Sequence, residues 1–368
     1  TTNSLDRQRV QRVITCTDPK TGLQVRCVAV VYKDFPTVEW TLYFKNTGKS
    51  DTPIISDVQA LVTHIERSGE TEFVLHHNEG TRIKSNDYEP LVTVLNPPAR
   101  LSFAPPGGRP MGFVFPYFNM EFQGRGVILA VGWSGQWAAR FTRDGSKGLG
   151  VRAGQELTHF KLLPGENVRT PLIAMQFYKG DWIRAQNVWR RWMVAHNVPR
   201  PGGKLPPPQM TPCSSHQFAE MVNANEDNQK LFIDRYLEEG LKIDYWWMDA
   251  GWYVCNGSWV NTGTWEVDTK RFPRGLRAIS DHAHKKNVRI VVWFEPERVT
   301  PGTWLYTKHP DWLLAQPGDP NGQKLLDLGN PKALEWLIDH IDKLITEQGI
   351  DLYRQDYNID PLTYWRAS

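Results

Sequence analysis

The chain has 368 residues with a net charge of +3, 40% hydrophobic and 23% charged residues, an ordinary composition for a globular protein of more than one domain. The small net charge, without any block of like charges, argues against a nucleic-acid partner. The sequence contains no apolar run of about 18 residues, so it predicts no membrane-spanning helix.

Residues 1–178 are predicted to form antiparallel β structure. Segments rich in Val, Ile, Thr and aromatic residues are separated by turn clusters such as Asp18-Pro19 and Asn46-Thr47-Gly48. Strands are expected at 10–17, 23–32, 38–46, 53–66, 112–118, 126–132, 137–142 and 157–163. Many short strands without intervening helices are typical of a sandwich. We interpret this part as one β domain without a catalytic constellation.

Residues 179–208 are predicted to connect two domains. Apolar residues recur at helical spacing from Asp181 to His196, and Asp181 is a suitable N-cap. The Trp-rich helix is expected to pack between the domains. The proline-rich stretch 199–208 then forms a stiff connection.

Residues 209–368 alternate between strand and helix patterns. Strands are predicted at 210–214, 243–248, 288–294 and 352–355, and helices at 226–239, 276–286 and 334–348. Repeated βα units indicate a parallel sheet, and carboxylates at successive strand ends favour the first half of a (β/α)8 TIM barrel. Half a barrel leaves a sheet edge uncovered, so we expect the remainder of the barrel to be absent from this chain or supplied by a second chain or segment. A homo-oligomer is left open.

The four cysteines leave the compartment open. Cys16 and Cys27 are symmetric about the 21–22 bond, and a hairpin centred there would bring them within disulfide reach. Cys213 and Cys255 are a second candidate pair. One plausible bridge favours a secreted or periplasmic location over the cytoplasm.

Three predicted strands end in acidic side chains, at Asp249, Glu295 and Asp356. The C-terminal strand ends of a barrel build its active site, and sugar hydrolysis needs carboxylates beside an aromatic face. Arg354 and Asp356 leave their strand on one side, where the cation keeps the carboxylate ionised; the alternative is a surface ion pair. No spacing demands a metal, and no cofactor is expected.

Several motifs follow one another along the second half of the chain. They are Asp249-Ala250-Gly251-Trp252, Trp265-Glu266-Val267-Asp268, 271–276, 293–297, 309–312, 326–331 and Arg354-Gln355-Asp356-Tyr357-Asn358. In this order they resemble the motifs of glycoside hydrolase family 36 of clan D. That family contains retaining α-galactosidases and α-N-acetylgalactosaminidases. The resemblance implies an N-terminal β-supersandwich before the barrel, an α-galactoside or α-N-acetylgalactosaminide glycan as substrate, and no metal or cofactor.

The resemblance also assigns residues. Asp356 matches the nucleophile, and Arg354 stands where the family has a lysine that contacts sugar hydroxyls. Asp249 matches the first of two adjacent aspartates that bind the sugar, and Ala250 replaces the second. Losing an anionic acceptor alters sugar preference.

Three further residues, Trp293, Asn358 and Trp252, are assigned to the substrate site. Trp293 matches a tryptophan that lines the sugar, whereas Trp252 is expected mainly to support its strand end. The resemblance places the general acid/base on a sixth strand, beyond residue 368 and so not in this chain.

The resemblance predicts a retaining exo-glycosidase that releases terminal α-linked galactose through a glycosyl-aspartate. An α-N-acetylgalactosaminidase or α-galactosaminidase is an alternative because of Ala250 and Arg354. A non-catalytic carbohydrate-binding relative is the alternative from another class.

Overall fold

The computed structural model describes all residues 1–368. The chain divides into two compact units, Thr1–Gly203 and Lys204–Ser368. The division falls inside the segment 179–208 that the sequence predicted as the connection. No helix of the chain has the length and apolar character needed to cross a membrane.

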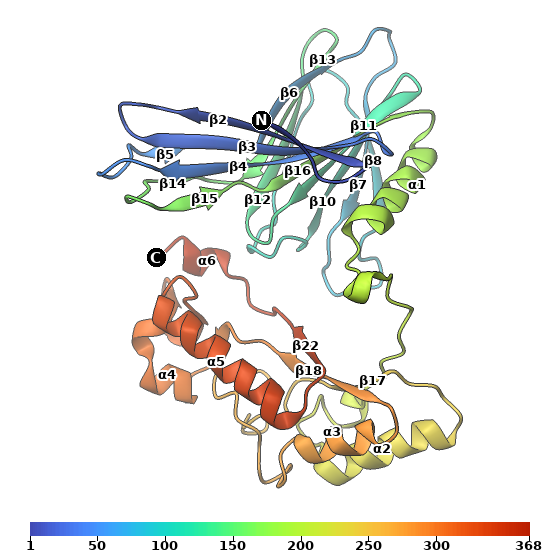
Figure 1. Ribbon diagram of the computed structural model, residues 1–368, viewed down its shortest axis with the longest axis vertical. Helices are drawn as coiled ribbons and strands as arrows, with labels where there is room; N and C mark the ends of the chain where they lie inside the picture. Colours follow the sequence, from blue (N-terminus) through green and yellow to red (C-terminus); the bar gives the residue numbers. More distant parts are fainter. The chain divides into compact units, whose positions relative to one another are not determined.

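The first unit contains a large, fully antiparallel sheet (Figure 1). In spatial order its strands are β1 (Thr2–Ser4), β2 (Arg9–Thr17), β3 (Leu23–Tyr32), β4 (Thr37–Asn46), β16 (Leu172–Lys179), β11 (Arg125–Gly132), β10 (Val114–Phe122), β7 (Val74–Glu79) and β8 (Pro90–Val94), with β15 (Asn167–Arg169) also paired to β4.

A second sheet packs on it. Its strands, in order, are β6 (Leu61–Glu66), β13 (Gly148–Gln155), β12 (Trp137–Arg143) and β9 (Arg100–Phe103), and β14 (His159–Phe160) pairs separately with β5 (Ile55–Ser56). One buried cluster joins both sheets, with Phe118 and Ile173 from the large sheet and Phe141 from the small one. The first unit is therefore a β-sandwich, as the composition of its strands predicted.

The predicted strand at 53–66 is two strands. Asp57 has a positive φ of 52°, a left-handed conformation that interrupts an extended chain. Only β5 and β6 remain on either side of it. The strand predicted at 157–163 shortens to β14 in the same way, because it pairs only with the two residues of β5.

The hairpin register separates the two N-terminal cysteines. Cys27 pairs with Ile14 and Cys16 pairs with Val25, two residues away from the symmetric register that would oppose the thiols. All four cysteines, including Cys213 and Cys255, are free. The expectation of a Cys16–Cys27 bridge is wrong for this structure, because the turn lies one residue earlier than assumed.

Helix α1 (Trp182–Trp192) begins as predicted. Asp181 is its N-cap and accepts a hydrogen bond from the Arg184 amide at 2.8 Å. The helix continues as a short π-helix, η1 (Met193–Asn197). Trp192 packs edge-on against Tyr32 at 5.4 Å, so α1 covers the large sheet of the first unit.

The second unit is built on a parallel sheet in the order β17 (Tyr245–Met248), β18 (Arg289–Phe294) and β22 (Leu352–Gln355). Helix α2 (Glu226–Glu238) precedes β17, whereas α3 (Arg277–His284) and α5 (Pro331–Gln348) lie in the connections between the strands, and α3 contacts both other helices (Figure 1). The strand and helix alternation predicted from sequence is present.

The predicted first strand at 210–214 is reduced to one bridge. Cys213 pairs in parallel with Trp247, and the Pro212 carbonyl accepts the Trp247 amide at 3.0 Å. Pro212 has no N–H to donate, which prevents a regular ladder. The sheet is open within residues 1–368, and the barrel stays an expectation from the resemblance.

The sequence did not predict seven strands of the first unit, which are β1, β7, β8, β9, β13, β15 and β16. Several smaller elements were not predicted either. They are the antiparallel group β19 (Arg298–Val299), β20 (Leu313–Gln316) and β21 (Asp319–Leu326), the helices α4 (Trp304–Lys308) and α6 (Leu362–Trp365), and the 3-10 turns η2 (Pro201–Gly203), η3 (Ser215–Gln217) and η4 (Pro310–Trp312).

The two faces of the parallel sheet differ. Trp246 is fully buried and donates to Gln229 of α2 at 3.0 Å, so this face lies against the helices. Alternate side chains point to the other face, where Leu352 is 45% exposed. The candidate site residues follow on this less covered face.

Candidate active site

The strand register brings three predicted residues into one row. Met248 pairs with Val292, and Trp293 pairs with Arg354. Asp249 is the next residue after Met248, so it lies level with Trp293 and Arg354 at the carboxyl edge of the sheet. Side chains at equal levels of a parallel sheet share a face. Asp249, Trp293 and Arg354 therefore lie on one face, and Asp356 follows two residues after Arg354.

Asp356 is surrounded by donors. Its Oδ2 accepts from the Trp293 indole at 2.8 Å and from the Asn358 amide at 3.0 Å, and it lies 2.7 Å from the Arg354 guanidinium. Its Oδ1 accepts only the backbone N–H of Tyr357, at 2.8 Å. The Asp356 side chain remains 28% exposed. The carboxylate is held firmly on one oxygen and open on the other.

These contacts keep Asp356 ionised. Burial by itself would raise the pKa of the carboxyl, but Arg354, Trp293 and Asn358 stabilise the charged form and lower the pKa to about 2. At neutral pH the group is therefore a carboxylate held by its donors. Its backbone is also held, because its N–H donates to the Phe294 carbonyl at 2.7 Å.

Asn358 links Asp356 to a buried glutamate. Its backbone N–H donates to Glu295 Oε1 at 2.6 Å, and its side-chain amide reaches Glu295 Oε2 at 3.4 Å. Glu295 has no exposed surface and forms an ion pair with Arg298. Burial raises the pKa of Glu295. The sequence grouped Glu295 with the site without assigning it a partner.

Asp249 is held by groups from the chain beside it. The Ser215 hydroxyl donates to Asp249 Oδ2 at 2.7 Å, and the Ala250 N–H donates to Oδ1 at 2.9 Å. Ser215 lies in η3, where the sequence predicted no site residue. Its hydroxyl was therefore missed.

A second carboxylate near Asp249 was also missed. Burial and the negative charge of Asp249 raise the pKa of Glu220. Glu220 has a positive φ of 56°, and the N–H of the next residue, Met221, donates to the Ala250 carbonyl at 2.6 Å. This loop thus folds back onto the end of β17. The sequence could not show that Glu220 lies near Asp249, because the two residues belong to segments that meet only in the folded chain.

Trp252 does not reach the site. Its side chain is fully buried, and its indole N–H donates to the Trp293 carbonyl at 2.8 Å. It therefore supports β18 from within the core, in line with the expectation that Trp252 mainly supports its strand end. Trp293 itself is 2% exposed, with its indole N–H directed at Asp356. Trp259 is less buried and meets Trp293 edge-on at 6.1 Å.

Glu297 lies near the same edge of the sheet. Burial raises its pKa to about 7, and Gln355 donates to its Oε1 at 3.4 Å. The two glutamates of this motif therefore have different surroundings, because Glu295 pairs with the buried Arg298 whereas Glu297 is contacted by the neutral side chain of Gln355.

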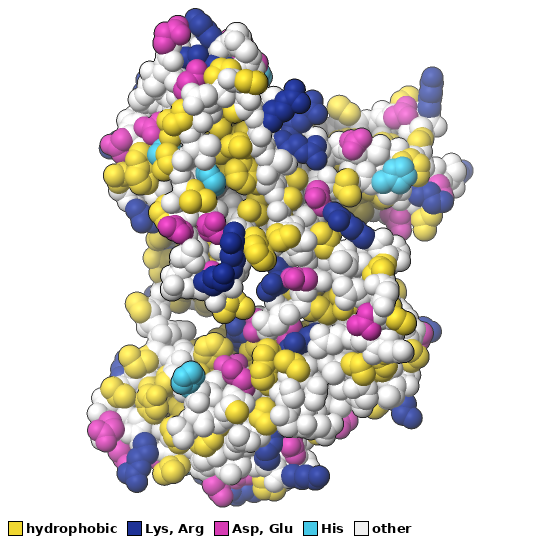
Figure 2. Space-filling model, turned by 180° about the vertical axis from the view of Figure 1, so that it is seen from behind, with side chains coloured by type: hydrophobic (Ala, Val, Ile, Leu, Met, Phe, Trp, Pro, Cys, Tyr) yellow, Lys and Arg dark blue, Asp and Glu magenta, His cyan; other side chains and the backbone are white.

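No group of three or more His, Cys, Asp or Glu side chains is placed to hold a metal ion. On the face shown in Figure 2, acidic and basic side chains are intermingled within each unit.

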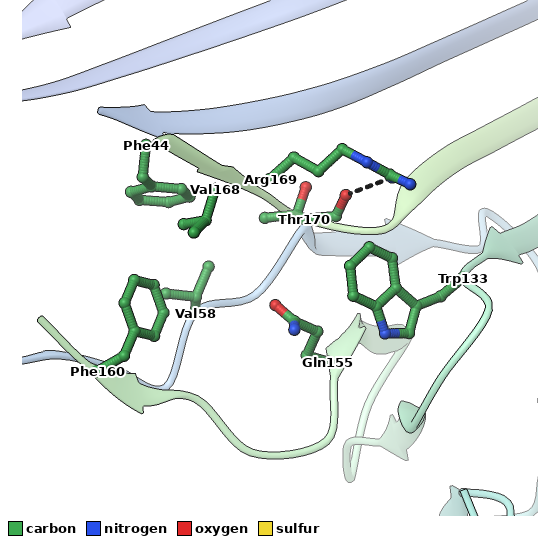
Figure 3. A pocket seen from close by; sticks show the side chains of 8 residues that line it. All are labelled: Phe44, Val58, Trp133, Gln155, Phe160, Val168, Arg169 and Thr170. Atoms are coloured by element: carbon green, nitrogen blue, oxygen red, sulfur yellow. Dashed lines mark hydrogen bonds between the residues drawn. The ribbon is translucent and has the colours of Figure 1, made fainter. Parts of the chain in front are cut away.

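A separate pocket of about 350 Å³ lies in the first unit, lined by Phe44, Val58, Trp133, Gln155, Phe160, Val168, Arg169 and Thr170 (Figure 3). The Arg169 guanidinium lies over the Trp133 ring at 5.0 Å and donates to the Thr170 carbonyl at 3.3 Å. The aromatic face most suited to a sugar is therefore covered by this chain's own arginine.

The candidate site residues lie within a segment that matches a known protein family. Residues 218–363 match the Melibiase family model. This segment contains Asp249, Trp293 and Asp356, and it excludes the β-sandwich. The family resemblance seen in the motifs is supported in this coarser form.

The curated relatives are named α-galactosidases. The chain is 23% identical to alpha-galactosidase Mel36A of Lactobacillus acidophilus, over 94% of this chain and 47% of the relative. It is 30% identical to alpha-galactosidase 2 of Hypocrea jecorina, over 66% of this chain and 35% of the relative. The chain thus spans about half the length of its curated relatives or less. The α-N-acetylgalactosaminidase alternative receives no support from these names.

Solved structures share the fold. The GH36 α-galactosidase AgaA of Geobacillus stearothermophilus aligns with a TM-score of 0.81 at 18% identity, covering 97% of this chain and 50% of AgaA. Both units of the chain therefore have counterparts in one known architecture. A variant of AgaA has been solved in complex with raffinose.

Proposed function

We propose that the protein containing this chain is a retaining exo-α-galactosidase, with Asp356 as its nucleophile. The proposal rests mainly on the contacts of Asp356. Its carboxylate is ionised, and its Oδ2 is held by Trp293, Asn358 and Arg354 at the edge of the parallel sheet. The relatives named α-galactosidases, and the raffinose complex of AgaA, suggest terminal α-galactosides as substrates.

The chemistry follows from the two oxygens of Asp356. Oδ2 accepts from the side chains of Trp293 and Asn358 and forms an ion pair with Arg354, whereas Oδ1 keeps a lone pair free beside its single backbone donor. In the first step Oδ1 forms a bond to the anomeric carbon, and the bond to the leaving alcohol breaks as an acid protonates the departing oxygen. Water then cleaves the β-galactosyl ester, which regenerates the carboxylate and releases α-galactose.

The remaining site residues have distinct roles in this proposal. Asp249 accepts hydrogen bonds from sugar hydroxyls, while Arg354 and Asn358 contact hydroxyls near the nucleophile. Trp293 supplies an edge of the sugar site as well as a donor. Retention requires a second carboxyl group about 5 to 5.5 Å from the first, and we assign it to a segment that completes the barrel rather than to this chain.

Removing the nucleophile tests the proposal. In the full-length protein, Asp356→Ala is expected to lower kcat on p-nitrophenyl α-galactoside about 10⁴-fold or more. Sodium azide should partly restore turnover and yield the β-galactosyl azide, because the small anion enters the vacated face. Asp339→Ala, which removes an exposed carboxylate of α5, is the control.

Covalent labelling gives an independent answer. A fluorinated α-galactosyl fluoride should trap an ester on the wild-type protein, and peptide mass spectrometry should place it at residue 356. A label on another carboxylate, or full activity of the Asp356→Ala variant, contradicts the assignment.

A second substrate class is favoured by one specific observation, the alanine at position 250. With Ala250 beside Asp249, the sugar site has one carboxylate fewer in this row than two adjacent aspartates would give. A 2-acetamido or 2-amino galactoside is then the alternative substrate. The ratio of kcat/KM for p-nitrophenyl α-galactoside and its 2-acetamido analogue decides between them. If neither is cleaved yet galactose binds, the protein is a carbohydrate-binding relative.

A further inference from the structure

The residues around Asp356 include an ion pair that stability alone does not explain. Glu295 directly follows β18 and has no exposed surface, and Arg298 at the start of β19 is only 5% exposed. Their side chains form a buried salt bridge. Such a pair is often no more stabilising than apolar residues of the same volume, because both charges lose their hydration. Its contacts show a second use.

One contact runs from the carboxylate of the pair. Glu295 Oε1 accepts the backbone N–H of Asn358 at 2.6 Å, and Oε2 lies 3.4 Å from the Asn358 side-chain amide. That amide donates to Asp356 Oδ2 at 3.0 Å. Glu295 therefore determines both where Asn358 lies and which way its amide points.

The other contact runs from the guanidinium. Arg298 lies over the ring of Trp259 at 5.0 Å, and Trp259 meets Trp293 nearly at right angles, with ring centroids 6.1 Å apart. The Trp293 indole then donates to Asp356 Oδ2 at 2.8 Å. Arg298 thus supports the second neutral donor through one aromatic contact.

Both paths end on the same oxygen. We propose that the buried pair Glu295–Arg298 positions the nucleophile by holding the two neutral donors of Asp356 Oδ2 in place. This inference rests on the proposed function, because it treats Asp356 as the nucleophile. The pair touches no substrate and acts through Asn358 and Trp293, so its members are positioning residues. With Oδ2 held from two sides, Oδ1 keeps a constant direction towards the anomeric carbon.

The substitution Glu295→Gln tests the carboxylate path. Glutamine keeps the size of the side chain and one acceptor for Asn358, but its NH₂ group opposes the Arg298 guanidinium. We expect kcat/KM to fall on the order of 10²-fold, mainly through kcat, as for a misplaced reacting group. We also expect the acidic limb of kcat/KM against pH to move up by about one unit, because Asp356 loses a donor that stabilises its charged form.

A matched control separates positioning from stability. Arg143 is another buried arginine, in the first unit, and it pairs with Glu72 at 2.9 Å. Glu72→Gln should lower the melting temperature without moving the acidic limb. Glu295→Gln with a lower melting temperature but an unmoved limb and unchanged kcat would show a merely structural pair, and would overturn the inference.

A double variant tests the path itself. If Glu295 acts through Asn358, adding Glu295→Gln to Asn358→Ala should slow the enzyme much less than Glu295→Gln slows the wild type, and what remains is the path through Arg298 and Trp293. Losses that multiply contradict the path.

A crystal structure of the Glu295→Gln variant needs no activity. A separation of Asn358 Nδ2 from Asp356 Oδ2 clearly longer than the 3.0 Å of the wild type, or a rotated Asp356, supports the inference. An unchanged contact overturns it. Because this measurement does not require turnover, it keeps the inference testable even if the wild type cleaves no α-galactoside.

Discussion

Asp356 differs from an ordinary surface aspartate because three hydrogen-bond donors and one ion pair fix its carboxylate. Arg354 and Tyr357 are its neighbours in sequence, but Trp293 belongs to another strand, 63 residues earlier. Local spacing predicted the ion pair with Arg354. The indole and the buried Glu295 behind Asn358 come from β18, and only the pairing of β18 with β22 brings them to the carboxylate.

Glu297 predicts a pH dependence of stability. Its pKa is raised from 4.5 to about 7 by burial, so the folded state holds this proton more tightly than the unfolded chain. Stability is then highest below pH 4.5 for this group and is lost as pH rises towards 7. The loss is on the order of 1 to 3 kcal/mol.

Glu297→Gln removes that titration. Its free energy of unfolding in urea should change less between pH 5 and pH 7.5 than that of the wild type, and the variant should be the more stable protein at pH 7.5. Equal slopes for the two proteins would show that Glu297 does not carry a raised pKa. Since Gln355 reaches Glu297 only at 3.4 Å, loss of that contact contributes little.

Ser215 predicts an effect on substrate affinity. Without its hydroxyl, Asp249 keeps only the Ala250 amide as a donor. A hydrogen bond to a charged group contributes about 1.5 to 3 kcal/mol, so Ser215→Ala should raise KM roughly 10-fold or more while kcat changes little. Steady-state kinetics of the full-length protein measures both.

The adjacent serine is the control for that experiment. Ser214 is buried as well, but its hydroxyl bonds to Gln229 of α2 at 3.1 Å rather than to the site. Ser214→Ala should therefore lower stability and leave KM unchanged. If both variants raise KM equally, Ser215 does not act through Asp249.

Among the elements, helix α5 shows which boundaries a sequence predicts well. Its C-terminal end at Gly349 was predicted, because a glycine in the left-handed region is a common helix terminator. Its start was placed three residues late. Asn330 caps the helix by accepting the Lys332 N–H at 3.1 Å, and Pro331 occupies the first helical position, where a proline is well suited.

Gly349 provides a test at this scale. It has a φ of 63°, and an added Cβ would lie 2.8 Å from the Ser280 hydroxyl, which itself donates to the Gln348 carbonyl at 2.7 Å. Gly349→Ala should lower the free energy of unfolding by about 1 to 2 kcal/mol for the left-handed backbone, with a further loss from the contact with Ser280. Urea unfolding measures it.

Gly240, after α2, separates the effect of the left-handed backbone from the effect of the contact with Ser280. It has a φ of 76° with nothing within 4 Å of an added Cβ, so Gly240→Ala should show the backbone effect alone. A Gly349→Ala variant no less stable than Gly240→Ala would mean that Ser280 moves aside at no cost.

At the scale of the whole molecule, two units of different architecture share one chain. The β-sandwich has its own core, and the parallel sheet with α2, α3 and α5 has another. Matches to relatives extend over both units, whereas the Melibiase family model covers only residues 218–363 of the second. The candidate site lies within that second unit.

The free cysteines give a prediction for the molecule as a whole. All four thiols are unbridged, so no covalent link restrains the unfolded chain. The melting temperature should be the same with and without dithiothreitol, and a thiol assay in denaturant should count four groups per chain. Fewer thiols, or a lower melting temperature on reduction, contradicts the hairpin register that keeps Cys16 and Cys27 apart.

The sequence by itself predicted the change from β strands to alternating strands and helices, many of the strands, the four longer helices and the order of the acidic strand ends, because these follow from the burial period of each segment. It also placed Arg354 beside Asp356, two residues apart on one strand. Tertiary structure alone decided the register of the cysteine hairpin, the burial of Trp252, and the contacts of Ser215 with Asp249 and of Glu295 with Asn358. These partners lie 34 and 63 residues apart, and local pattern carries no information about which distant side chains a fold brings into contact.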